Sequence, residues 1–211
     1  MKTKFMPEET LYKKFLLNNC SFDSAHDLAH IQRVVKSAQT ICDEEGGDLD
    51  IVKAAAWLHD SVTLPKNHPD RSKSSILAGE KAAAFLNSID FPETKVKHVV
   101  HAIEAHSFSA GIEPTTLEAK IVQDADRLDA LGAIGVARCL MVGGKLDRAL
   151  YQPEDPFCES RDPDDSIYTI DHFYEKLFKL PELMNTESAK EMAVERIRFM
   201  KQFLSELQKE I

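Results

Sequence analysis

The sequence lacks most features that mark a secreted or membrane-spanning protein. Its four cysteines, Cys20, Cys42, Cys139 and Cys158, are scattered over 211 residues and form no C-x-x-C pair. This spacing is a poor disulfide framework and is typical of thiols in a reducing compartment. The first residues, MKTKFMPEET, contain no apolar signal-peptide core, and no apolar run approaches the roughly 18 residues that span a bilayer. We therefore expect a cytoplasmic protein with no membrane partner.

Positive charge is also scarce. The chain has 26 Lys and Arg against 35 Asp and Glu, which gives a formal net charge of −9 at pH 7. Nucleic acids are bound through basic surfaces, so we expect no nucleic-acid partner. A small anionic ligand stays compatible with this charge wherever a local site supplies cations. A chain of this length can bury a core without a structural metal, so any bound metal is expected to serve chemistry.

No segment alternates apolar and polar residues as a half-buried strand does, because the apolar residues recur at helical spacing. The pattern predicts an all-α fold, a single helical bundle over residues 1–211 with no significant sheet. Residues 143–165 are rich in proline and charge and form the longest predicted loop, a kind of segment that is usually functional or disordered. The predicted helices span 6–18, 24–45, 51–60, 73–88, 92–106, 115–126, 128–142, 166–179 and 187–209.

Four side chains that can bind a metal lie on or at the end of predicted helices, beside apolar residues: His30, His59, Asp60 and Asp126. A charged Asp among buried neighbours is costly unless it is paired or binds a cation. Taken singly, a His on an apolar helix face is usually a core residue, and an Asp at a helix end is usually a cap. Two imidazoles and two carboxylates converging from three helices would instead form a metal site with positions open for water and substrate oxygens.

The order and local context of these residues resemble the HD-domain superfamily of metal-dependent phosphohydrolases. His30–Val34 is similar to the H-x-x-R-V element, Ala56–Asp60 to the A-x-L-H-D element and Ala125–Leu128 to the A-D-x-L element. The resemblance covers about residues 20–200, with the metal-site core at about 24–130 and C-terminal helices at about 166–209. The small stand-alone bacterial branch of the YedJ/YpgQ type is the most similar, through the segments His26–His30, Leu64–Pro69, Ala105–Ser109, Gln123–Ala133 and His172–Leu177.

The resemblance implies one divalent metal ion held by His30, His59, Asp60 and Asp126. Mn²⁺ or Mg²⁺ is favoured, with Ni²⁺, Co²⁺, Fe²⁺ and Zn²⁺ as alternatives. It also implies a hydrolase that acts on a small phosphorylated substrate, with a nucleotide favoured because some relatives cleave nucleoside triphosphates to a monophosphate and pyrophosphate. The alternatives are a nucleoside monophosphate phosphatase, a cyclic-nucleotide phosphodiesterase and a non-catalytic metal or nucleotide sensor. A homodimer is common among helical hydrolases of this size.

Basic side chains near the motifs are candidates for substrate contacts: His26, Arg33, Lys66, His68, Arg71 and Lys145. The first two share a helix face with His30, at spacings of four and three residues. The next three follow His59 and Asp60 in one loop, which we interpret as a phosphate clamp, with a solvated charge run as the alternative. Lys145 begins the long loop and would close over a triphosphate.

Two further histidines are candidates for proton transfer. His101 and His106 lie on or at the end of one predicted helix, and an imidazole titrates near neutral pH, as a group that protonates a leaving group must. We therefore interpret His101, His106 and Asp60 as catalytic residues, with Asp60 also a metal ligand.

Overall fold

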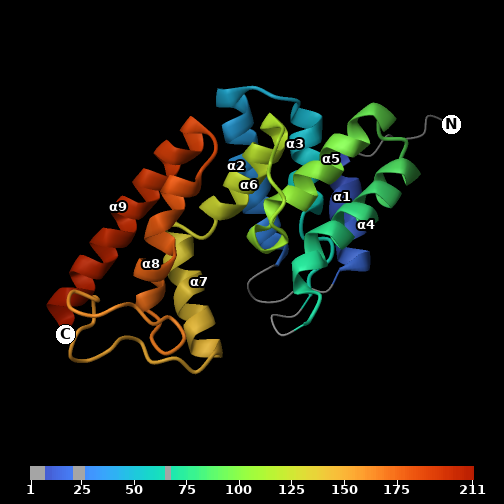
Figure 1. Ribbon diagram of the computed structural model, residues 1–211. Helices are drawn as coiled ribbons and strands as arrows, with labels where there is room; N and C mark the ends of the chain where they lie inside the picture. The colour runs from blue at the N-terminus through green and yellow to red at the C-terminus, as the bar shows by residue number, and fades with distance from the viewer. Residues whose placement is uncertain (1–7, 21–26, 65–67) are drawn as a thin grey trace. The chain divides into compact units, whose positions relative to one another are not determined.

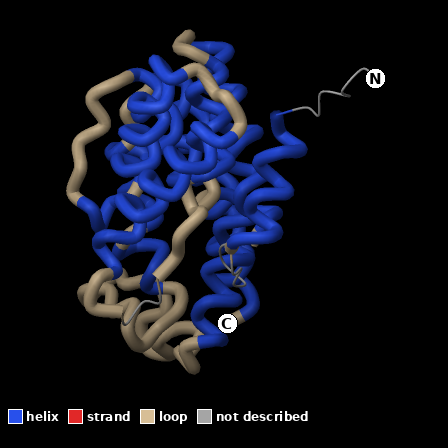
Figure 2. Tube along the Cα trace, turned by 90° about the vertical axis from the view of Figure 1, so that its right-hand side faces the viewer, coloured by secondary structure: helices blue, strands red, loops and turns tan. Residues whose placement is uncertain are grey.

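The computed structural model describes residues 8–20, 27–64 and 68–211, and these residues form helices and connecting loops with no named strand (Figure 2). The all-α fold class is therefore confirmed. No helix in this part of the chain combines the length and apolar character that crossing a bilayer requires. The chain divides into two compact units, Met1–Asp126 and Arg127–Ile211, and the single domain expected over 1–211 stays a prediction.

The first unit is built around one predominantly apolar helix. This helix, α3, buries Ile51, Val52 and every residue from Ala54 to Leu58, and it packs against α1, α2, α4 and α5 (Figure 1). Because most of its surface is apolar, with Asp50 and Lys53 as its charged residues, α3 packs in the interior, so the residues that follow it begin inside the unit. The elements are α1 (Glu8–Asn19), α2 (Leu28–Glu45), α3 (Leu49–Leu58), η1 (Arg71–Lys73), α4 (Ser74–Ser88), α5 (Glu93–His106), η2 (Phe108–Ala110) and α6 (Leu117–Leu128).

Local sequence signals fix the ends of α2 and α3. Asp27 caps α2, since its Oδ1 accepts a hydrogen bond from the His30 backbone N–H at 2.7 Å. Gly46 ends this helix with a φ of 85°, a conformation that glycine adopts without strain. Asp48 then caps α3 by accepting from the Ile51 N–H at 3.4 Å. The short connection between these caps sets the two helices side by side.

The second unit contains α7 (Gly132–Lys145), α8 (Asp171–Glu175), η3 (Leu177–Leu183) and α9 (Glu187–Glu210), with α7 and η3 packed against α9. The helix predicted over 166–179 is correct only in part, since α8 covers Asp171–Glu175 alone and η3 begins at Leu177. The backbone N–H of Thr169 donates to the carbonyl oxygen of Ala149 at 2.8 Å. The chain before α8 therefore bonds to the long loop rather than continuing a helix. After α8 the chain tightens into a 3₁₀ helix containing Pro181, which lacks an N–H and disfavours an α conformation at Leu180.

The long predicted loop begins at Leu146, because α7 runs through Lys145. It is organised by hydrogen bonds. Asp155 accepts the backbone N–H groups of Glu159 at 2.9 Å and Ser160 at 2.8 Å. The Arg161 guanidinium then holds the fully buried carboxylate of Asp171 with bonds of 2.5 and 2.7 Å.

Candidate metal centre

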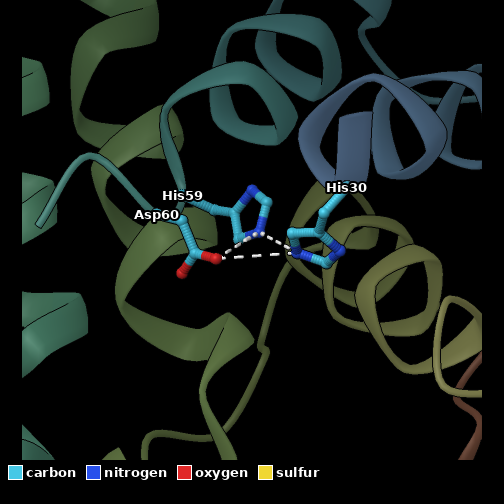
Figure 3. A group of neighbouring side chains, drawn as sticks. All are labelled: His30, His59 and Asp60. Atoms are coloured by element: carbon cyan, nitrogen blue, oxygen red, sulfur yellow. Dashed lines mark hydrogen bonds and ion pairs between the residues drawn. The ribbon is translucent and has the colours of Figure 1, made fainter. Parts of the chain in front are cut away.

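Two imidazoles and one carboxylate meet inside the first unit. His30 comes from the first turn of α2, while His59 and Asp60 follow the last turn of α3 (Figure 3). The Nε2 atoms of the two histidines are 3.4 Å apart, and Asp60 Oδ2 lies 3.6 Å from His30 Nε2 and 3.5 Å from His59 Nε2. All three donor atoms lie within 4.8 Å of one another. The three side chains therefore converge on one point.

A second carboxylate approaches the same point from α6. Asp126 Oδ1 lies 3.4 Å from His30 Nε2 and 3.9 Å from His59 Nε2. Ligands about 2.1 Å from one ion are about 3.0 Å apart at right angles and about 3.4 Å apart in a tetrahedral arrangement. The observed separations lie at and just beyond this range, so the four predicted ligands are brought together by the fold.

The environment of His59 fits a bound cation. Its Nδ1 lies 2.9 Å from the Ala56 carbonyl oxygen, a contact that requires the ring proton on Nδ1 and leaves the lone pair on Nε2. Burial lowers the pKa of His59, although the charge of Asp60 acts in the opposite direction. The lowered pKa keeps the ring neutral. A fully buried lone pair then faces two carboxylate oxygens, an arrangement that a divalent cation stabilises.

His106, at the end of α5, faces the other oxygen of Asp60. Its Nε2 lies 3.8 Å from Asp60 Oδ1, and its ring packs edge-on against the His59 ring, with 4.9 Å between centroids. Its Nδ1 lies 2.6 Å from the Ile103 carbonyl oxygen. Asp60 therefore presents Oδ2 to the imidazoles of His30 and His59, and Oδ1 to His106.

Comparisons with known proteins identify the family to which this chain belongs. Residues 27–131 match the family model described as the HD domain. The chain is 37% identical to YpgQ of Bacillus subtilis over 192 residues, which cover 89% of this chain and 85% of YpgQ. The chain belongs to the HD-domain family. The resemblance noted from the motifs is thus confirmed.

Solved structures agree with this assignment. The crystal structure of Bacillus subtilis YpgQ in complex with ADP matches with a TM-score of 0.74 and 33% identity, covering 97% of this chain and 98% of that one. An HD-superfamily hydrolase from Bacillus thuringiensis matches with a TM-score of 0.73 and 38% identity, covering 96% and 95%. The protein is therefore an HD-superfamily hydrolase.

Of the other residues predicted for this HD-domain site, His101 is engaged elsewhere. Its Nε2 lies 3.1 Å from the Thr115 backbone nitrogen and 3.0 Å from the Thr115 hydroxyl, so the ring holds the connection between α5 and α6. His106 alone of the two predicted catalytic histidines has a described contact with Asp60. The sequence could not separate them, since both lie on α5.

The residues predicted to contact the substrate belong to several different elements of the chain. Arg33 lies half-buried on α2, one turn after His30. His68 is exposed and accepts the Asp70 N–H on Nδ1 at 3.1 Å, while Arg71 begins η1. Lys145 is exposed at the end of α7 in the second unit. His26 and Lys66 lie outside the described residues.

Two supporting residues were missed by the sequence reasoning. Asp27 fixes the start of α2 through the His30 N–H, a role that its position three residues before a ligand could have suggested. The buried amide of Gln123 donates to the Ala105 carbonyl at 2.7 Å, which ties α6 to the end of α5. A polar residue inside the apolar stripe IVQDA was the available signal.

Proposed function

We propose that this HD-superfamily hydrolase is a metal-dependent phosphohydrolase that acts on a nucleotide, with cleavage of a nucleoside triphosphate to a monophosphate and pyrophosphate as the favoured reaction. The observation that carries the proposal is the convergence of His30, His59, Asp60 and Asp126 on one point. When bound there, a divalent ion lowers the pKa of water and polarises a phosphoryl oxygen. The chain supplies the ligands, the orientation of the substrate and the transfer of protons.

His106 is the proposed proton donor. With Nδ1 bonded to the Ile103 carbonyl, its Nε2 faces Oδ1 of Asp60, one of the proposed metal ligands, at 3.8 Å. An imidazole at this position can protonate the departing phosphate oxygen. Asp60 Oδ1 orients the ring, as carboxylates do for catalytic histidines.

The donor set favours a first-row transition ion. Imidazole nitrogens suit such ions, whereas Mg²⁺ takes oxygen ligands and retains several waters. Of the two ions expected from the sequence, Mn²⁺ fits two imidazoles and two carboxylates better than Mg²⁺. Ni²⁺, Co²⁺, Fe²⁺ and Zn²⁺ stay as alternatives that reconstitution must compare.

A nucleotide substrate is supported by the relative that binds one. The YpgQ structure contains ADP, and YpgQ shares this chain's fold over nearly its whole length. In our proposal basic side chains would hold the phosphates, and the candidates from the sequence stay His26, Arg33, Lys66, His68, Arg71 and Lys145. The acidic composition supports the prediction of no nucleic-acid partner, and the scattered cysteines support that of a cytoplasmic protein. A homodimer is part of the proposal and is tested by sedimentation.

The test is a turnover assay on protein stripped of metal and reloaded with one ion at a time. The substrates are nucleoside triphosphates, monophosphates and cyclic phosphates, with pyrophosphate and phosphate counted separately. We expect metal-dependent release of pyrophosphate from triphosphates. Phosphate release from monophosphates, or ring opening alone, would identify the alternative reactions. Metal binding without turnover on any substrate would overturn the proposed reaction and favour a sensor.

Asp60→Ala tests the site itself, with Asp43→Ala as its control, since Asp43 is an exposed carboxylate on α2. We expect Asp60→Ala to lose both bound metal and turnover, because it removes a ligand and the orienting contact of His106. Full turnover in this variant would contradict the assignment. The thermal transition of each variant without metal separates loss of function from loss of folding.

A further inference from the structure

The turn that carries Asp60 is held from outside the metal centre. Ser61 is buried and donates its N–H to the Leu58 carbonyl at 3.0 Å, which closes the turn after α3. Its hydroxyl donates to the Ala78 carbonyl at 3.3 Å, and its own carbonyl accepts from Lys81 Nζ at 3.0 Å. Ala78 and Lys81 share one face of α4 at a spacing of three residues. Helix α4 therefore holds Ser61 at two points.

The Lys81 ammonium joins three parts of the first unit. Besides Ser61, it donates to the Asn19 carbonyl at the end of α1 at 2.7 Å. Its third neighbour is Cys20 Sγ at 3.9 Å, and the ammonium lies 5.7 Å from the centre of the Phe15 ring. A charged donor binds carbonyl oxygens more strongly than a neutral one. Such a contact is suited to fixing backbone geometry at a defined position.

The Ser61 carbonyl receives a second donor from the same region. Cys20 Sγ lies 3.2 Å from this oxygen, and burial raises the pKa of the thiol, which keeps its proton in place. On the other side of Asp60, the His59 ring is fixed by the Ala56 carbonyl. Asp60 is thus the residue between two anchored neighbours, and we expect displacement of either one to move its carboxylate.

We propose that Lys81 is a positioning residue of the metal centre, which orients the Asp60 carboxylate by fixing the carbonyl of Ser61. The inference rests on the proposed metal-dependent function. Metal ligands need to be held within about 0.5 Å of their productive positions by the groups behind them. Residues that orient ligands in this way typically change metal affinity by about 10-fold to 100-fold when they are replaced.

Lys81→Met tests this role, because methionine keeps an unbranched apolar side chain but donates no hydrogen bond. The matched control is Lys53→Met. Lys53 lies on α3 and pairs with Glu9 of α1 at 3.8 Å, so it also links α1 to α3 without contacting Ser61. Each protein is titrated with Co²⁺ and with Mn²⁺, and kcat, KM and the thermal transition without metal are measured. The visible spectrum of bound Co²⁺ reports the coordination geometry.

We expect Lys81→Met to raise the metal Kd by about 10-fold or more and to alter the Co²⁺ spectrum, with the larger loss in kcat rather than KM. Lys53→Met should stay within about 2-fold of the wild-type metal Kd. Lys81→Arg, which keeps a charged donor, should recover most of the affinity and serves as the folded variant should Lys81→Met fail to fold.

The outcomes separate the two proposals. If the wild type binds neither Co²⁺ nor Mn²⁺, the proposed function fails and Lys81 has no metal ligand to position. If the wild type binds metal and turns over substrate while Lys81→Met keeps the same metal Kd and spectrum, the positioning role alone is overturned. Equal losses of metal affinity in Lys81→Met and Lys53→Met would also overturn it, since they would show a general loss of packing.

Discussion

Acidic side chains are used in opposite ways in the two units of this protein. In the second unit the Asp171 carboxylate lies 2.5 and 2.7 Å from the Arg161 guanidinium nitrogens and accepts the Asp164 backbone N–H at 2.7 Å. In the first unit the carboxylates of Asp60 and Asp126 face imidazole nitrogens at 3.4 to 3.9 Å. The first arrangement is a closed set of hydrogen bonds, whereas the second has the spacing of ligands around an ion.

The difference shows how a buried acid can be assigned to stability or to function. A carboxylate that is matched by a guanidinium and an N–H at hydrogen-bonding distance maintains the fold, and removal of its partner destabilises the protein. A carboxylate grouped with imidazole nitrogens beyond hydrogen-bonding distance gains little without a cation, so its removal should affect metal binding instead. Four predictions test this contrast, and they are ordered by the size of the expected effect.

Asp126→Asn should cost the most activity and almost no stability. The variant removes the charge of a proposed ligand on α6 while the side chain keeps its size. We expect turnover to fall by at least about 100-fold and the metal Kd to rise in parallel. The unfolding free energy without metal should change by less than about 1 kcal/mol, because Asp126 is 31% exposed and faces other potential ligands.

This result is checked by urea unfolding of metal-free protein beside a metal titration, with the exposed Asp43→Asn on α2 as the control. A large loss of stability in Asp126→Asn with metal affinity unchanged would place Asp126 in the same class as Asp171. The contrast between the two units would then be lost.

Arg161→Met should show the reverse pattern. Burial raises the pKa of Asp171, but the hydrogen bonds from Arg161 and the Asp164 N–H bring it below its usual value. Without Arg161 the fully buried carboxylate loses its charged partner, which should lower the unfolding free energy by about 3 kcal/mol. Arg198→Met, an exposed arginine on α9, is the control. Metal Kd values like those of the wild type are expected at temperatures where the variant is folded.

Double replacement sharpens the test of Arg161. Arg161→Met combined with Asp171→Leu should regain part of the lost stability, because the uncompensated charge is then absent. If the double variant is less stable than Arg161→Met, the value of this pair lies in its hydrogen bonds to the loop rather than in charge compensation.

The sequence predicted accurately those helices in which each buries a continuous apolar stripe of its own. Helices α2, α3 and α9 lie close to their predicted ranges, since caps such as Asp48 and breaks such as Gly46 are local signals. Only Asp171–Glu175 of the helix expected over 166–179 is α-helical, and the reason is non-local. The segment before α8 pairs with Ala149, a partner that no local pattern indicates, and Pro181 tightens the chain after it.

For the site, the sequence predicted which residues form the proposed ligand set, but it did not predict the partners of the neighbouring side chains. The proposed ligand set follows from motif order, because each of its residues lies in a recognisable local context. The side-chain partners do not: His101 and His106 lie on the same helix, yet one bonds to Thr115 and the other faces Asp60. Their roles depend on which way each ring turns, and this is set by packing between helices.

The two histidines of α5 should therefore differ in turnover. We expect His106→Gln to lower kcat by about 10-fold to 100-fold, because it removes the group proposed to protonate the departing phosphate oxygen. His101→Gln should stay within about 3-fold of the wild type, with a small loss of stability from the Thr115 contacts. The decisive measurement is kcat of the two variants, compared side by side with saturating metal. Equal effects in both variants would contradict the assignment.

The smallest expected effect is a change in the pH dependence of stability, and it concerns His172 in the second unit. The Nδ1 atom of His172 lies 2.6 Å from Asp165 Oδ2. Burial lowers the pKa of His172 from 6.5, against the opposing effect of the Asp165 carboxylate. The folded protein therefore binds this proton less tightly than the unfolded chain, and stability should fall as pH falls below about 6.5. In His172→Gln this contribution is absent, so the melting temperature should decline less between pH 7.5 and 5 than in the wild type or in His68→Gln, an exposed control. If the decline is instead steeper in His172→Gln, the Asp165 pair raises the pKa of the ring above its unfolded value, and His172 belongs with the charge-paired groups that Arg161 represents.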